Sequence, residues 1–166
     1  MKSLVDSERL VDAINGKLGS YLAQINSLML SEKDADKKRV FSHAIADIER
    51  VADLAEKIGE YAGQKNVVFS DAAKKDLERV FDNAAQVYSM AAKLLRRRRR
   101  SLALDIGQKE KEFNELELMY LQKYIVRQES DASRPRVDAL YPNILQDLER
   151  ISDHANNMAE HVMRIS

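Results

Sequence analysis

Asp47-Ile-Glu-Arg-Val-Ala-Asp53 and Asp147-Leu-Glu-Arg-Ile-Ser-Asp153 have nearly the same sequence and lie one hundred residues apart. Both stretches keep an aspartate, a Glu-Arg pair, a β-branched residue and a second aspartate at the same spacing, which indicates an internal duplication. Within each copy a glutamate and an aspartate four residues apart share one helix face, where like charges repel by about 0.2–0.5 kcal/mol per pair. We therefore expect a feature that compensates this repulsion.

The composition favours a single all-α domain over residues 1–166, folded as an antiparallel helical bundle. Only five glycines and two prolines interrupt 166 residues that are rich in good helix formers. The 27 basic and 27 acidic residues leave no net field that would attract nucleic acid. Because the chain has no cysteine, thiol catalysis and thiolate metal sites are excluded.

Apolar residues recur at helical spacing along most of the chain, and we expect five helices. Ser31 and Ser70 are good N-cap residues, and the polar stretch at 130–135 is the clearest linker. The predicted helices span about 5–30, 36–64, 70–95, 102–128 and 143–165.

Acidic and amide side chains form rows beside the apolar stripes of four of these helices. If each pair of neighbouring helices folds back on itself, the rows face one another, and each hairpin gathers four oxygen-bearing side chains. These candidate metal ligands are Glu8, Asp12, Glu49 and Asp53 in the first hairpin, and Glu110, Asn114, Glu149 and Asp153 in the second.

Oxygen ligands with few histidines suit a divalent hard cation or an oxo-bridged iron cluster. The alternative is that the acids are solvated or paired with arginines such as Arg50 and Arg150. A carboxylate-bridged metal store is disfavoured, because no histidine has a glutamate three residues before it. Since no nucleophile with a base and no glycine-rich phosphate loop is present, we expect no enzyme activity.

The duplicated Asp-[Ile/Leu]-Glu-Arg-[Val/Ile]-x-Asp-x-Ala pattern resembles the signature of the PhoU-like family. The resemblance extends to Tyr21-Leu22, Leu30-Ser31, Phe69-Ser70 and the stretch 120–127. This fuller pattern is similar to the C-terminal PhoU-like domain of bacterial sodium/phosphate cotransporter-related proteins. It implies two repeats of the three-helix type, at about 1–66 and 70–166, of which the first lacks its opening helix.

The resemblance implies that Glu49, Asp53, Glu149 and Asp153 are the metal motif, with the acids of the preceding helices as plausible additional ligands. Asn114 replaces an acid, so the second cluster is expected to be one charge poorer and to bind metal less tightly. A third copy of the motif, Asp76-Leu-Glu-Arg-Val-Phe-Asp82, carries less weight because the family does not usually place its signature there.

The implied function is a non-enzymatic regulatory domain of phosphate transport and phosphate homeostasis. Its expected partner is a membrane phosphate transporter or the transmembrane part of the same protein, which places it in the cytoplasm at the inner face of the membrane. A helical scaffold without metal is the alternative. The residues do not show whether a membrane-spanning portion precedes Met1.

Three further features lead to weaker predictions. The basic run Arg96 to Arg100 is either a solvated joint or a contact with anionic lipid. His154, next to Asp153, is a possible ligand, whereas His43 and His161 are expected at helix interfaces. Because the first repeat lacks a helix, its apolar groove is expected to recruit another chain, and we predict a homo-oligomer.

Overall fold

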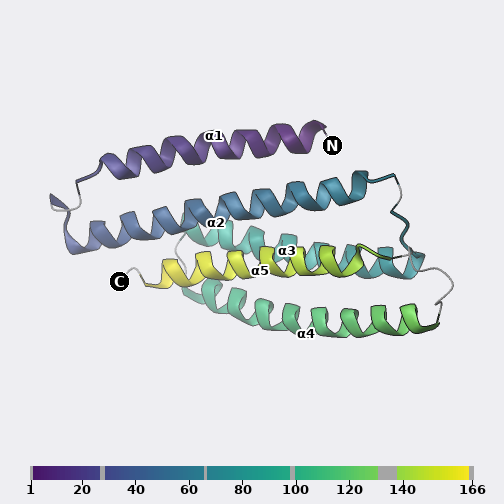
Figure 1. Ribbon diagram of the computed structural model, residues 1–166. Coiled ribbons are helices and arrows are strands. Elements are labelled where there is room, and N and C mark those ends of the chain that lie inside the picture. The colour runs from purple at the N-terminus through teal and green to yellow at the C-terminus, as the bar shows by residue number, and fades with distance from the viewer. Residues whose placement is uncertain (1, 27–28, 66, 98–99, 131–137, 165–166) are drawn as a thin grey trace.

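The chain folds into five helices in the computed structural model, which describes residues 2–26, 29–65, 67–97, 100–130 and 138–164. No strand occurs within these ranges, so the all-α prediction is confirmed. The helices are α1 (Lys2–Gln24), α2 (Glu32–Gly63), α3 (Asp71–Arg97), α4 (Arg100–Ser130) and α5 (Tyr141–Met163), as Figure 1 shows.

Two serines set the starts of α2 and α3, as their sequence context predicts. The Ser31 hydroxyl accepts a hydrogen bond from the backbone N–H of Asp34 at 3.2 Å. The Ser70 hydroxyl accepts one from the backbone N–H of Ala73 at 3.1 Å. Each cap satisfies a backbone donor that has no partner inside its helix. Helix α2 therefore begins at Glu32, earlier than the apolar pattern predicts.

The end of α1 was predicted wrongly, because the helix stops at Gln24 and not near Leu30. Beyond it, the Lys38 ammonium of α2 donates a hydrogen bond to the backbone carbonyl of Ile25 at 2.8 Å. This bond fixes the chain where it turns toward α2. The apolar residues at 25–30 continue the helical spacing, and spacing alone does not distinguish a last helical turn from an apolar connection.

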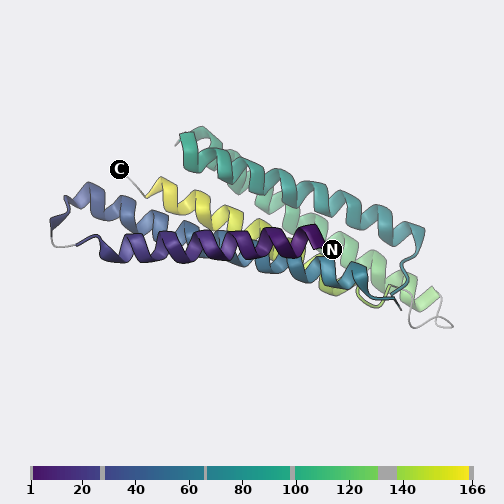
Figure 2. The same cartoon turned by 90° about the horizontal axis from the view of Figure 1, so that it is seen from above.

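Helices α3, α4 and α5 pack side by side as a three-helix bundle, and α2 lies against α5 (Figures 1 and 2). Helix α1 packs chiefly on α2, at the edge of the molecule. Helix α5 is central and buries twelve residues, including Tyr141 and Leu148. In α1, by contrast, Asn15 alone among the described residues is buried. The apolar core therefore belongs mainly to the second half of the chain.

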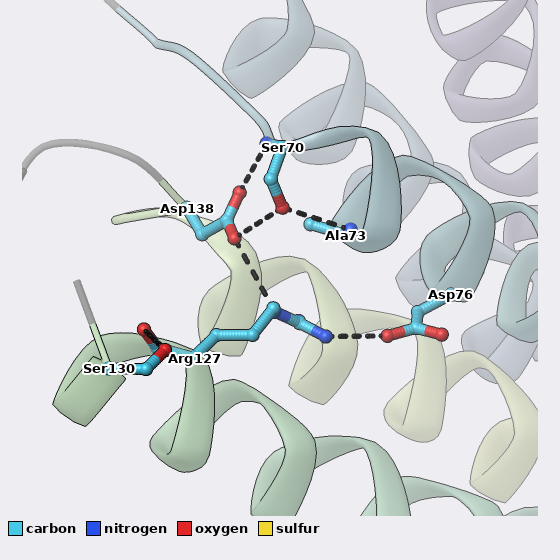
Figure 3. A network of polar contacts seen from close by, with 6 residues as sticks. All are labelled: Ser70, Ala73, Asp76, Arg127, Ser130 and Asp138. Carbon is cyan, nitrogen blue, oxygen red and sulfur yellow. Dashed lines mark hydrogen bonds and ion pairs between the residues drawn. The ribbon is translucent and has the colours of Figure 1, made fainter.

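A polar network closes the end of the bundle where α4 leads into α5 (Figure 3). The Arg127 guanidinium lies 2.7 Å from the Asp76 carboxylate and 3.6 Å from that of Asp138. Asp138 in turn accepts hydrogen bonds from the backbone N–H and the hydroxyl of Ser70, at 2.7 and 2.8 Å. Its φ of 62° is a left-handed conformation that aspartate tolerates better than most residues. The network ties α3, α4 and the start of α5 together.

Two predicted features fall partly outside the described residues. The linker predicted at 130–135 includes residues 131–135, and the arginine run at 96–100 includes residues 98–99, none of which is described. Helix α3 ends at Arg97 and α4 begins at Arg100, and the two helices pack against each other. Lipid contact through this run stays a prediction.

Candidate metal centre

Three carboxylates from α1 and α2 converge on one point. Glu8, Asp12 and Asp53 each offer an oxygen atom, and these atoms lie within 4.8 Å of one another. A hydrogen bond that the protonated Glu8 carboxyl donates to Asp12, partial burial and the charges of Asp12, Glu56 and Asp53 raise the pKa of Glu8 above its ordinary value. A cation would relieve this repulsion, and carboxylate oxygens are the ligands that hard divalent cations prefer. The group could hold a metal ion.

Glu49 is not part of this group of three. In the antiparallel hairpin Glu8 and Asp12 lie level with Asp53 and Glu56, and Glu49 lies one helical turn further along α2, toward the position level with Asn15. Glu56 is instead the fourth acid that acts on Glu8. Folding the first two predicted helices back on each other already places Glu8 beside residues 56–60, but the predicted ligand set followed the repeated motif and so contained Glu49 and not Glu56.

A second acidic cluster lies between α4 and α5. Burial and the charges of Asp153, Glu117 and Glu110 raise the pKa of Glu149 to about 7. Beside it, the Asn114 amide donates a hydrogen bond to the Glu110 carboxylate at 2.5 Å. All four predicted residues of the second hairpin therefore lie in one region. Nowhere in the described ranges do three acids of this second region come as close together as those of the first.

Glu117 was missed by the sequence analysis, and it alters the comparison of the two clusters. Burial and the charge of Asp153 raise the pKa of Glu117, so it belongs to the second cluster. Its position on α4 corresponds to Asn15 on α1, just as Asn114 corresponds to Asp12. The second cluster therefore has an amide where the first has Asp12, and an acid where the first has Asn15. The expectation that the second cluster is one charge poorer did not count Glu117. The signal was its spacing of seven residues from Glu110, which is two helical turns on one face.

The first aspartate of each motif copy has a structural role, because it binds a basic side chain of another helix. The Asp147 carboxylate of α5 accepts a hydrogen bond from the Lys57 ammonium of α2 at 2.9 Å. The Asp47 carboxylate of α2 lies 3.0 Å from Nδ1 of His154 of α5. In the third copy Asp76 binds Arg127. The motif thus combines an inter-helix pair with two acids on a neighbouring face.

The three histidines all lie along the α2–α5 interface. His154 is buried, and its Nδ1 is paired with the Asp47 carboxylate and not with an acid of either cluster, so its suggested role as a ligand stays a prediction. The His43 and His161 rings stack with their centroids 4.3 Å apart, which confirms the expected interface position. Burial and the neighbouring His43 lower the pKa of His161.

A groove of about 720 Å³ opens beside the second cluster. Its lining includes Glu110 of α4 and Asn156 of α5. Gly107 also lines it, and a side chain there would meet the Asn156 amide oxygen. The groove gives water and small ions a route to the buried edge of the cluster.

The PhoU domain model matches residues 76–162, from the third motif copy in α3 almost to the end of α5. The match covers just over half of the chain and all but the last residue of the α4–α5 hairpin. The chain belongs to the PhoU family. PhoU domains are regulatory helical domains, and this membership suggests a role in phosphate homeostasis. No curated protein sequence matches the chain. Within the described part of the chain, no helix combines the length and apolar character needed to cross a bilayer.

Proposed function

We propose that this PhoU-family protein is a non-enzymatic regulator of phosphate transport that binds divalent cations at its acidic clusters. The observation that carries the proposal is the convergence of Glu8, Asp12 and Asp53 in a chain whose α3–α5 part matches the PhoU domain. The first cluster is exposed on α1 and α2. Water would complete the coordination of a cation there, as is usual for hard ions with few protein ligands.

The second cluster is the better candidate for a site that responds to both protons and metal. The pKa of Glu149 of about 7 means that this carboxyl holds a proton over part of the physiological range. A cation must displace that proton, so cation affinity at α4–α5 should fall as the pH drops below about 7. An iron cluster remains compatible with the ligand type, but the oxygen-only donor set favours a divalent ion such as Mn²⁺ or Mg²⁺.

Metal binding is tested by titrating Mn²⁺ into the chelator-treated protein in a calorimeter. The Asp53→Asn variant removes one of the three converging carboxylates, and we expect it to weaken one Mn²⁺ site at least tenfold. Asp82→Asn is the matched control, because Asp82 has the same motif position on α3 and is exposed like Asp53, but lies outside both clusters. Wild-type protein that binds no Mn²⁺, or equal losses in both variants, would contradict the proposal and favour a metal-free scaffold.

The regulatory role is tested separately in cells that lack the gene. We propose that the partner is a membrane phosphate transporter, or a transmembrane part of the same protein, at the cytoplasmic face of the membrane. Radioactive phosphate uptake should rise in the deletion strain and return to normal with the wild-type gene. Asp53→Asn should restore regulation poorly and Asp82→Asn fully. Unchanged uptake in the deletion strain would refute this role.

A further inference from the structure

Helix α1 exposes a continuous apolar stripe that no described part of the chain covers. Leu10, Ile14, Leu18 and Tyr21 are exposed by 61%, 46%, 44% and 63%, although they are large and apolar. Their spacing of four, four and three residues puts them on one face of the helix. Phe41, exposed by 39%, belongs to the half of α2 that lies beside the C-terminal end of α1.

In the α4–α5 hairpin, the face that corresponds to the apolar stripe of α1 is covered by another helix. When α1 is aligned with α4 through Glu8 and Glu110, Leu18 corresponds to Tyr120, which is only 2% exposed. Phe41 corresponds in the same way to Tyr141, which is fully buried. Helix α3 packs on α4 and α5 and covers that face. The position equivalent to that of α3 is open on the α1–α2 hairpin, at the edge of the molecule in Figures 1 and 2.

The stripe on α1 is also wider than its counterpart on α4. Leu10 and Tyr21 correspond to Glu112 and Lys123, which are exposed charged residues. Packing against a helix in the position of α3 therefore does not explain why Leu10 and Tyr21 are apolar, since α4 has charged residues there. Apolar residues at positions that are charged in the other copy indicate a surface made for contact.

We propose that two copies of the chain form a symmetric dimer in which the α1 stripes pack antiparallel, so that α1 of each copy occupies the open position on the other. An antiparallel neighbour has the same orientation relative to α1 as α3 has relative to α4. A symmetric contact needs a self-complementary patch, and an apolar stripe on a single helix provides one.

The charges beside the stripe support this occupant and set its register. Asp6 and Lys17 are exposed and lie on the same side of the stripe, roughly 20° apart around the helix. Antiparallel helices bring equivalent sides together. The register in which Leu10 faces Ile14 of the second copy brings Asp6 of each copy beside Lys17 of the other. The two charges are then offset along the helix axis by about one residue. The dimer would thus gain two symmetric ion pairs at its rim.

The exposed area is consistent with a dimer of modest affinity. The four stripe residues and Phe41 together expose roughly 500 Å² of apolar surface, at the upper end for the largest patch of a monomer. Pairing two such patches would remove roughly 1,000 Å², the lower limit of a specific interface. Glu8 and Asp12 lie about 120° and 160° around α1 from the centre of the stripe, so dimer formation does not depend on metal binding.

The dimer is tested by sedimentation equilibrium of the full 166-residue chain over a range of concentrations. Wild-type protein should show a concentration-dependent monomer–dimer equilibrium, and Ile14→Glu should weaken it at least tenfold. Leu118→Glu is the matched control, because Leu118 is 62% exposed on α4 and outside the stripe. A monomer at every concentration, or equal weakening by both variants, would overturn the proposal. So would a higher oligomer that Ile14→Glu leaves intact.

A charge exchange tests the register with variants that change only exposed residues. Lys17→Asp should weaken the dimer about threefold to tenfold, because it places acids opposite each other at both rim pairs. Adding Asp6→Lys to Lys17→Asp should restore wild-type affinity. If the double variant is as weak as the single one, the antiparallel register is wrong.

Discussion

The α1–α2 and α4–α5 hairpins carry the same motif and similar acidic rows, but they differ in what surrounds them. Helix α3 covers α4–α5, whose Phe113, Tyr120 and Tyr141 are almost fully buried. Among the residues that the structure describes, no third helix covers the α1–α2 hairpin in this way, and apolar residues along α1 are exposed. The motif therefore fixes which acids face each other, whereas the third helix decides how deeply the hairpin is packed.

The electrostatics of the two acidic clusters differ in the same direction. Burial is the main cause of the raised pKa of Glu149 in the second cluster. For Glu8 in the first cluster, the main cause is a hydrogen bond that its protonated form donates to Asp12. Similar residues thus form a proton-binding site in the packed hairpin and an exposed group of carboxylates in the open one. The two should respond differently to pH.

The largest expected effect contrasts the cores of the two hairpins. Phe113→Ala should lower the free energy of unfolding by about 3–5 kcal/mol, because it leaves a cavity between fully packed helices. Val11→Ala, at the corresponding position of α1, should lower it by less than about 1 kcal/mol, because Val11 is only half-buried. Urea denaturation measures both. Losses of equal size would show that α1 is packed as tightly as α4.

A medium effect contrasts Glu149 with Glu49. The pKa of Glu149 is about 7 in the folded protein and 4.5 in the reference state. The folded protein therefore binds more protons than the unfolded protein between pH 4.5 and about 7. The free energy of unfolding therefore falls as the pH rises through this window. Glu149→Gln should match wild type at pH about 4 and be more stable by about 1–2 kcal/mol at pH about 8, after allowance for solvent screening.

The control for this pH effect is Glu49→Gln, which changes an exposed acid at the same motif position. Its stability should stay within about 0.5 kcal/mol of wild type at both pH values. Both variants are measured by urea denaturation with a chelator present. A Glu149→Gln protein without added stability at high pH would show that the second cluster is not strained.

The smallest effect contrasts the caps of α2 and α3. Ser31→Ala should lower the free energy of unfolding by about 0.5 kcal/mol, as expected for an exposed cap. Ser70→Ala should lower it by about 1 kcal/mol, since the Ser70 hydroxyl donates a hydrogen bond to the buried Asp138, whereas the bond from Ser31 to Asp34 is exposed to solvent. Thermal unfolding followed by circular dichroism gives both values. The reverse order would mean that the network at the end of the bundle adds little stability.

Much of the fold could be predicted from sequence because its signals are local. Ser31 and Ser70 mark helix starts, and apolar spacing identifies all five helices. The end of α1 was missed because the bond from Lys38 to Ile25 joins residues on different elements. Local pattern contains no information about such a bond.

The candidate site was predicted only in part, for a similar reason. Glu49 repeats Glu149 in sequence, but antiparallel packing brings Glu8 and Asp12 level with Asp53 and Glu56 instead. Glu117 was recognised as a member of the second cluster only from the packing of α4 against α5. The pairing of Asp47 with His154 depends on the contact between α2 and α5, which the sequence analysis did not predict.

The exchange of partners between α2 and α5 also bears on how the duplicated chain could have evolved. Asp47 depends on His154, and Asp147 depends on Lys57, so each copy supplies the basic group that the other needs. Separating the copies between α2 and α3 would leave two buried carboxylates without their partners, which is strongly unfavourable. Each copy therefore stabilises a buried carboxylate of the other. We expect that a duplicated chain with such exchanged pairs is harder to divide into two stable halves than one whose pairs lie within each copy.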